Sequence, residues 1–251
     1  MKHHILNGDC LLEIFRPTDI SGEVIVDREA LIDGDVSGHT LEDFWKIRES
    51  YLVTTYGIVG GAYTVKVIPE FHKIIHAPPA SEFDLWFGYD LFCQVNMWFV
   101  LSLIKDRNKN DTINIIHPSY LSVEEIWNDF GSATPQDLVN CLNQRVKVTT
   151  KDLALGQHLW LAYKNHDLTA LKKLSATVSA CFPNLVQICQ AHIDRYIFSD
   201  GKNRLEMVIK DIINSSNDFN KVFAEFTKRE GIYGFGDLQV KKIYDKVLSG
   251  L

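Results

Sequence analysis

The sequence predicts an α/β protein, with an open, mostly parallel sheet flanked by helices, followed by an all-α C-terminal domain for which a winged-helix-like arrangement is one candidate. Two observations lead to this prediction. Short apolar runs alternate with longer amphipathic segments as far as residue 117, which is typical of strand–helix–strand units. Helical periodicity then dominates to the end of the chain. We expect an α/β domain over residues 1–130, carrying the candidate site, and a helical domain over residues 131–251.

The composition is that of a chain able to bury a sizeable core. Of 251 residues, 46% are hydrophobic and 23% are charged, which suits one large domain or two small ones. The formal net charge of -6 is unevenly spread: residues 1–125 hold 19 Asp and Glu against 10 Lys and Arg, whereas residues 126–251 hold 13 against 16. This asymmetry favours two domains. The acidic first half also argues against general nucleic-acid binding there, because phosphate contacts need a basic surface.

Neither a membrane span nor a secretion signal is expected. The richest apolar run, residues 91–104, is only 14 residues long and contains Gln94 and Asn96, so it predicts a buried core helix. The first residues reach Asn7-Gly8-Asp9 before a signal-peptide core could form. The five cysteines are odd in number and scattered, which favours reduced thiols. We therefore predict a cytoplasmic protein that does not bind a membrane.

The first half contains four expected strands, each a short run rich in β-branched or aromatic residues. They lie at residues 2–7, 23–27, 83–89 and 112–116. The helices are expected at about residues 9–16, 40–52, 69–76 and 90–104. Pro17 ends the first of these helices, and Thr40 with Asp43 forms the capping-box pattern that begins the second.

The second half contains helix-start signals at regular intervals. Ser122 with Glu125 has the capping-box spacing, and Thr134-Pro135 places proline in the first turn of another helix. Further helices are expected from Thr150 to about residue 163 and over residues 183–198, 203–214, 219–229 and 238–248. No strand is expected in this half.

Three of the strands stop at acidic residues, and this is the main functional signal. The stops are Gly8-Asp9, Asp27-Arg28-Glu29 and Asp90. If the strands are parallel neighbours, these groups meet at the carboxyl edge of the sheet, where open α/β folds bind ligands. The candidate catalytic residues are Asp9, Glu29 and Asp90; the candidate ligand-binding residues are Asn7, Gly8, Asp27, Arg28, Gln94 and His117.

Each candidate has an alternative structural role. Arg28 is suited to a bidentate grip on phosphate or carboxylate, or it forms an internal ion pair. Asp9 and Asp90 act as acid/base groups or ligands of a divalent cation, or they cap the helices that follow them. Neither a Gly-x-Gly-x-x-Gly nor a phosphate-loop pattern is present, so a standard dinucleotide or triphosphate site is not expected.

The last expected helix carries Lys241, Lys242 and Lys246. A helix-turn-helix or winged unit could use these lysines to contact DNA. A solvated face is the more common explanation of three lysines on a helix, so we do not expect DNA as a partner. The sequence predicts no oligomeric state.

Three segments resemble a bacterial family catalogued as domain of unknown function 1835. They are His-Ile-Leu-Asn-Gly-Asp at 4–9, the stretch at 22–31 that includes Arg28-Glu29, and the stretch at 84–94 that includes Asp90 and Gln94. The tail resembles the usual helical partner domain of that family through Leu159-Trp160, Phe182-Pro183-Asn184-Leu185 and Gly236-Asp237. The resemblance implies the two-part architecture and a site at the strand ends. It implies no reaction, because the family has no established activity.

Two functional hypotheses follow. The first is an enzyme that binds a small phosphorylated or anionic, nucleotide-like ligand at the carboxyl ends of the parallel strands, with a divalent cation as its candidate cofactor. The second is a non-catalytic ligand-sensing regulator whose helical C-terminal domain binds DNA or protein. A third explanation, with no ligand, is that the charged cluster is an internal network of ion pairs.

Overall fold

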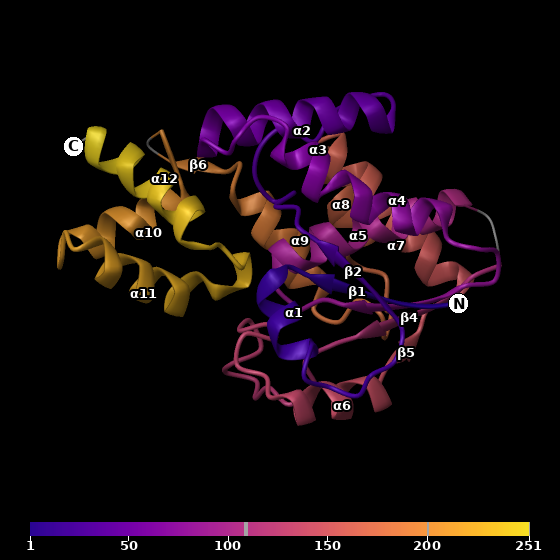
Figure 1. The fold of residues 1–251 in the computed structure, drawn as a ribbon. Helices are drawn as coiled ribbons and strands as arrows, with labels where there is room; N and C mark the ends of the chain where they lie inside the picture. Colours follow the sequence, from indigo (N-terminus) through magenta and orange to yellow (C-terminus); the bar gives the residue numbers. More distant parts are fainter. Residues whose placement is uncertain (108–109, 200, 251) are drawn as a thin grey trace.

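The computed structural model describes residues 1–107, 110–199 and 201–250. Its centre is a five-stranded sheet in the order β2-β1-β3-β4-β5 (Figure 1). Strands β1 (Lys2–Asn7), β2 (Glu23–Asp27), β3 (Glu82–Trp86) and β4 (Thr112–Ile116) are parallel. Strand β5 (Val146–Lys147) pairs antiparallel with β4 at the edge. The mixed α/β class with a mostly parallel sheet is therefore confirmed.

The strand order creates a reversal point between β1 and β3. From β1 the chain moves to β2 on one side, and it then crosses back to β3 on the other side of β1. The register aligns the strand ends, with Asn7 opposite Asp27 and Leu6 opposite Trp86. In open α/β sheets, such a reversal leaves a crevice at the carboxyl ends of the two central strands.

Helices cover both faces of the sheet. On one face lie α1 (Asp9–Phe15) and α6 (Pro135–Asn143), which bury Leu6, Trp86 and Ile116 in a small core. The other face packs against the larger core, which α2 (Leu41–Tyr56), α4 (Ile68–His76), α5 (Leu91–Arg107) and α7 (Thr150–Lys164) help to build. Figure 1 shows α1 and α6 below the sheet, on the side opposite α2 and α4. The short helix α3 (Ala62–Lys66) connects α2 to α4.

Helix α5 is the central helix of the molecule. All of its residues from Leu91 to Ile104 are buried except Phe92, so it is apolar on every side, as expected of an interior helix. Helix α7 packs closely along it at Gly156, where a Cβ would overlap the Leu101 side chain. Because α7 and β5 lie beyond residue 130, the second half of the chain contributes to the same core and sheet as the first.

Helices α8 (Leu168–Leu174) and α9 (Leu185–Asp194) follow α7 and complete this part of the fold. A short hairpin of β6 (Phe198–Ser199) and β7 (Lys202–Asn203) then leads to α10 (Arg204–Ile213), α11 (Phe219–Glu230), the 3-10 turn η1 (Gly231–Tyr233) and α12 (Asp237–Ser249). We call residues 204–249 the C-terminal helical unit. It forms a separate group at the left of Figure 1.

Several predicted elements need correction. The helix expected from Ser122 is wrong: residues 123–132 form turns, and the Ser122 hydroxyl donates to Glu125 at 3.0 Å without starting a helix. These turns let Phe130 insert into the small core. The third strand ends at Trp86, before the expected residue 89, because Gly88 packs against Asp129. The fourth predicted tail helix ends at Asp194, so Phe198 lies in a strand.

The second half is largely helical, but β5, β6 and β7 also lie there, and no strand was expected. Among the described residues, none of the helices has the length and apolar character needed to cross a membrane. All five cysteines carry free thiols, and only Cys10 is exposed.

Candidate functional site

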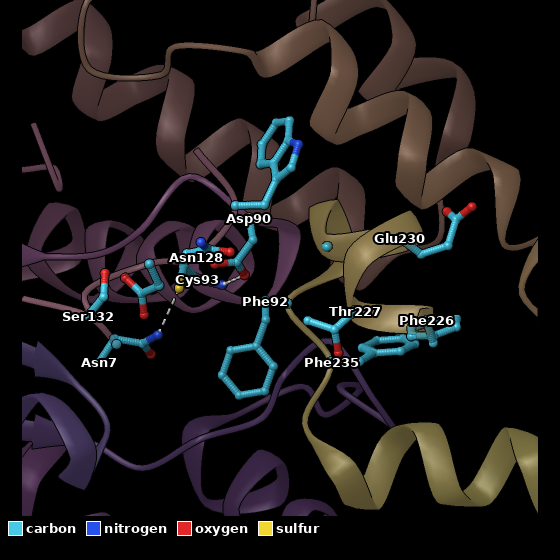
Figure 2. Close-up of a pocket in the computed structure, with 15 residues that line it drawn as sticks. Asn7, Asp90, Phe92, Cys93, Asn128, Ser132, Phe226, Thr227, Glu230 and Phe235 are labelled. Atoms are coloured by element: carbon cyan, nitrogen blue, oxygen red, sulfur yellow. Dashed lines mark hydrogen bonds between the residues drawn. The ribbon is translucent and has the colours of Figure 1, made fainter. Parts of the chain in front are cut away.

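A cleft of about 480 Å³ opens at the carboxyl ends of β1 and β3, at the reversal point of the sheet. One wall comes from the ends of the strands and the loops that follow β3 and β4. The opposite wall comes from α11, η1 and the loop after it, in the C-terminal helical unit (Figure 2). The lining residues are Asn7, Asp90, Phe92, Cys93, Trp127, Asn128, Asp129, Gly131, Ser132, Phe226, Thr227, Glu230, Gly231, Gly234 and Phe235.

Asp90 is positioned by the start of α5. It is only 2% exposed, and its Oδ1 accepts a hydrogen bond from the Cys93 backbone N–H at 2.9 Å. This is the geometry of a helix N-cap, so the capping role and a place in the cleft coincide in one residue. Gly234 allows the C-terminal wall to approach: its φ is 63°, and a Cβ there would overlap Asp90 Oδ1.

Asp129 is the second carboxylate of the cleft, and it was not among the predicted residues. It lies in the turns after β4 with a φ of 52°, in the left-handed region. Its Oδ1 is buried and has no hydrogen-bond partner in the described parts of the chain. Gly88 makes room for it, because a Cβ on Gly88 would overlap this carboxylate. Its place after the fourth parallel strand is the one signal that could have identified it from the sequence.

The Cys93 side chain lies close to both carboxylates. Its Sγ accepts a hydrogen bond from Asn7 Nδ2 at 3.0 Å, the contact marked by a dashed line in Figure 2. One ligand atom each from Asp90, Cys93 and Asp129 lie within 4.8 Å of one another. Two carboxylate oxygens and a sulfur are a donor set that could bind a divalent cation such as Zn²⁺ or Mn²⁺.

Burial raises the pKa of all three groups, and neighbouring carboxylate charge raises the pKa of Asp129 and Cys93 further. Burial, with the nearby Asp90 charge as a further cause, raises the pKa of Asp129 to about 7. Burial also raises the pKa of Asp90, although hydrogen bonds around Cys93 partly oppose it. The pKa of the Cys93 thiol is raised by burial and by the two carboxylates. Without a cation, the pair therefore prefers to share a proton near neutral pH.

The cleft has no positive charge of its own. Within the described parts of the chain, none of its lining residues is Lys, Arg or His. Aromatic rings occupy much of the remaining wall: Phe92 and Trp127 on the side of the sheet, and Phe226 and Phe235 on the side of the C-terminal helical unit. An acidic floor with aromatic walls is suited to a planar molecule that brings a cation or hydrogen-bond donors.

Of the predicted residues, Asn7 and Asp90 line this cleft. Asp9 and Arg28 lie outside it and bind each other: Arg28 Nη2 and Nε donate to the Asp9 carboxylate at 2.8 and 2.9 Å. Arg28 Nη1 also donates to the Lys66 carbonyl at 3.1 Å. This bidentate pair lowers the pKa of Asp9 through its hydrogen bond to Arg28. Arg28 thus already has a carboxylate partner within the chain.

Asp27 and Glu29 belong to a buried cluster beside the cleft. Glu29 accepts from Arg48 Nη2 at 2.9 Å and from the Tyr63 hydroxyl. Asp27 Oδ1 accepts from the Glu29 backbone N–H at 2.9 Å, whereas its buried Oδ2 has no partner among the described residues. Burial raises the pKa of Asp27 to about 8.

Asn96 of α5 connects this cluster to the cleft. Its Nδ2 donates to the Glu29 carbonyl at 2.7 Å and to Asn7 Oδ1 at 3.1 Å. Asn7 in turn contacts Cys93 through its own amide nitrogen. A continuous polar chain therefore runs along the carboxyl edge of the sheet, from the Glu29 backbone to the cleft.

The remaining predicted residues support the loops. Gly8, with a φ of 91°, donates its N–H to the Asp27 carbonyl at 2.8 Å and so ties the ends of β1 and β2 together. Gln94 Nε2 donates to the Gly88 carbonyl at 2.8 Å. The ring of His117 lies between the Phe87 and Cys181 carbonyls, and burial lowers its pKa to about 4.

Comparison with known proteins adds no family to this picture. No family model matches the chain, and no curated protein or solved structure is significantly similar to it.

Proposed function

We propose that this protein binds a small anionic, nucleotide-like ligand in the cleft through a divalent cation held by Asp90 and Asp129, and that it acts on that ligand as an enzyme. The observation that supports this most strongly is the pair of carboxylates, Asp90 buried and Asp129 partly buried, at the reversal point of a parallel sheet, in a cleft with room for a small molecule.

The cation follows from the charge of the cleft. An anionic group entering it would meet Asp90 and Asp129, and neither carboxylate has a basic partner in the lining. A divalent cation would relieve their repulsion and leave coordination positions for phosphate or carboxylate oxygens. Cys93 lies within reach as a third ligand, and its sulfur favours Zn²⁺ over Mg²⁺, whereas Mn²⁺ suits the two carboxylate oxygens.

The aromatic wall supports the nucleotide-like part of the proposal. Phe92 and Phe235 face the cavity from opposite walls (Figure 2). Aromatic rings stack on any nucleobase, and this contributes roughly 1–3 kcal/mol per base. The cleft therefore offers a stacking surface next to its polar floor.

The same carboxylates could perform acid–base chemistry. A carboxyl group with a pKa of about 7, as expected for Asp129 without a cation, can accept or release a proton at neutral pH. Asp90 beside it supplies a second group whose protonation is linked to the first. This arrangement supports a hydrolytic or isomerising reaction more than electron transfer.

Titration calorimetry with Mn²⁺, Zn²⁺ and Mg²⁺ tests the cation site. We expect one cation per chain, bound more tightly for Zn²⁺ or Mn²⁺, with Asp129→Asn and Asp90→Asn weakening it about tenfold or more. Asparagine keeps the capping ability at position 90. The matched control is Asp19→Asn, since Asp19 is exposed and lies outside the cleft. Equal binding by all four proteins, or no binding by the parent, would refute the site.

Ligand binding is tested next, in the presence of the bound cation. We expect a nucleoside phosphate to raise the melting temperature of the parent and of Asp19→Asn, but not of Asp129→Asn. An equal shift in all three would show that the ligand binds elsewhere.

A second candidate function is ligand sensing. It is supported by the position of the cleft between the sheet and the C-terminal helical unit, because a ligand there would contact both. A winged-helix-like output domain belongs to this candidate. The three lysines that such a domain could use to contact DNA, however, each contact a carboxylate of the same chain: Lys241 with Asp245, Lys242 with Asp33 and Lys246 with Glu206.

Turnover separates the two candidates. A sensor binds the ligand without converting it, and the full-length chain captures a DNA or protein partner only when the ligand is bound. An enzyme converts the ligand and needs both Asp90 and Asp129. Whichever function holds, we also propose that the protein is cytoplasmic and that it is related to the family of domain of unknown function 1835.

A further inference from the structure

A second cavity, of about 280 Å³, lies next to the cleft and shares Phe235 with it. It is formed by the residues after α9, by α10 and α12, and by Asp33 from the loop after β2. Its chemistry is opposite to that of the cleft. Three of its lining residues are basic (Arg195, Lys242 and Lys246), against two acidic ones.

Arg195 is the basic residue of the cavity that has no acidic partner in the described parts of the chain. Its Nη1 is buried and forms no hydrogen bond with any described residue. Its guanidinium carbon lies 5.6 Å from the centre of the Phe235 ring and 6.0 Å from that of the Tyr196 ring. The two rings hold the guanidinium at the cavity wall. Arg195 as a whole is only partly buried and lines the cavity, and none of the ion pairs of the described residues includes it, so its charge is available to an anion that enters the cavity.

The two lysines already have acidic partners. Lys242 Nζ lies 3.1 Å from Asp33 Oδ2, and Lys246 pairs with Glu206. These pairs account for both acidic residues of the lining, so the surplus positive charge of the cavity belongs to Arg195. Arg28 differs from Arg195 in this respect, because its Nε and Nη2 already donate hydrogen bonds to the Asp9 carboxylate.

We infer that this cavity is a binding site for the phosphoryl group of a small molecule, with Arg195 as its main ligand. A guanidinium donates two parallel hydrogen bonds to a phosphate or carboxylate. Asp33 and Glu206 balance the charges of the two lysines, so the preference for a phosphoryl group over a carboxylate rests on the larger charge and the additional acceptor oxygens that it presents to Arg195. Tyr196 and Phe198 are partly exposed at the cavity and offer an apolar surface to the rest of the molecule.

This inference does not depend on the cation site, and the test distinguishes the two sites by removing cations and by using Asp129→Asn. Phenyl phosphate is the probe, because it joins a phosphoryl group to an aromatic ring, and benzoate is its carboxylate counterpart. Binding is followed by 31P NMR for phenyl phosphate and by calorimetry for both probes, in buffer containing EDTA. We expect phenyl phosphate to bind the parent and Asp129→Asn equally, and more tightly than benzoate.

Variants of Arg195 test its role. Arg195→Gln should weaken phenyl phosphate binding by about tenfold or more, and Arg195→Lys should give an intermediate loss, because lysine keeps the charge but loses the paired donors. The control, Lys228→Gln, removes a positive charge from an exposed position in the C-terminal helical unit, outside the cavity, and should bind like the parent. The inference is overturned if the parent does not bind, if Arg195→Gln binds as well as the parent, if Lys228→Gln loses as much, or if benzoate binds equally well.

Discussion

Asp27 and Asp129 are carboxyl groups that the fold buries without a full set of hydrogen-bond partners. Asp27 is 1% exposed at the end of β2, and its Oδ2 has no partner in the described structure. Burial raises the pKa of Asp27 to about 8. In the unfolded chain this carboxyl titrates near its ordinary value of about 3.9. The folded protein therefore holds a proton that the unfolded chain releases between about pH 4 and 8.

This difference fixes the sign of a pH effect. Because the folded state binds more protons, the Asp27 contribution makes the free energy of unfolding fall as the pH rises from about 4 to 8. Asp27→Asn removes the ionisable group and retains an Oδ1 acceptor for the Glu29 N–H. We expect the variant to gain stability over the parent with rising pH, by on the order of 3 kcal/mol between pH 5 and pH 9. Urea denaturation at both pH values measures this; a gap independent of pH, as expected for Asp19→Asn, would contradict it.

For individual residues, the sequence predicted where the site lies better than which residues form it. Asn7 and Asp90 lie in the cleft because parallel strands bring their carboxyl ends to one edge, which the strand pattern alone implies. Asp129 was missed because its approach to Asp90 depends on turns and on the close contact with Gly88. Asp9 and Arg28 satisfy each other, as in the internal ion pair that was the alternative role of Arg28, although the sequence did not identify Asp9 as its partner.

At the scale of helices and strands, local signals predicted most of the fold. The capping box at Thr40 forms as expected, the helix with Pro135 in its first turn begins as expected, and three of the four predicted strands have the predicted bounds. The similar pattern at Ser122 does not start a helix, because tertiary contacts of Phe130 prevail over a local preference. Strand β5 is only two residues long, which is too short to show an alternating pattern in the sequence.

Helix α2 is attached to the carboxyl edge of the sheet by Arg48, which is fully buried and donates to Glu29. Removing one member of a buried ion pair leaves the other charge without compensation. We expect Arg48→Met to lower the free energy of unfolding by about 3–5 kcal/mol. The double variant Arg48→Met with Glu29→Gln should recover much of this loss.

Thermal and urea denaturation of the single and double variants check this prediction. Lys46→Met is the control, because Lys46 forms an exposed pair with Glu42 on the same helix and should leave stability unchanged. A double variant as unstable as Arg48→Met would mean that packing of the arginine, and not the unpaired Glu29 charge, causes the loss.

At the scale of the whole molecule, the C-terminal helical unit closes against the sheet edge through a few close contacts. Gly234 approaches Asp90 and Phe92, and Lys242 contacts Asp33 on the loop after β2. The cleft and the second cavity both lie along this junction and share Phe235. The position of the unit could not be predicted from the sequence, because it depends on contacts between residues more than 140 apart.

Gly234→Val tests this junction. The valine would occupy a φ of 63°, which β-branched residues rarely adopt, and its Cβ would overlap Asp90. We expect a loss of about 1–3 kcal/mol in stability and faster amide exchange in residues 231–235 and the start of α12. Gly201→Val is the control, since it also replaces a glycine of positive φ but has open space around it. Exchange of residues 231–235 that is no faster in Gly234→Val than in Gly201→Val would show that the close approach of Gly234 to Asp90 does not hold this junction together.

The central claim is that Asp90 and Asp129 form an interacting pair of carboxyl groups in one cleft. Its most direct test is a 13C NMR pH titration of the aspartate side chains, in cation-free buffer, on the parent and on Asp90→Asn. The account predicts a pKa of about 7 for Asp129 in the parent, and a lower value once the Asp90 charge is removed. An Asp129 that titrates near its ordinary value in both proteins would contradict the account.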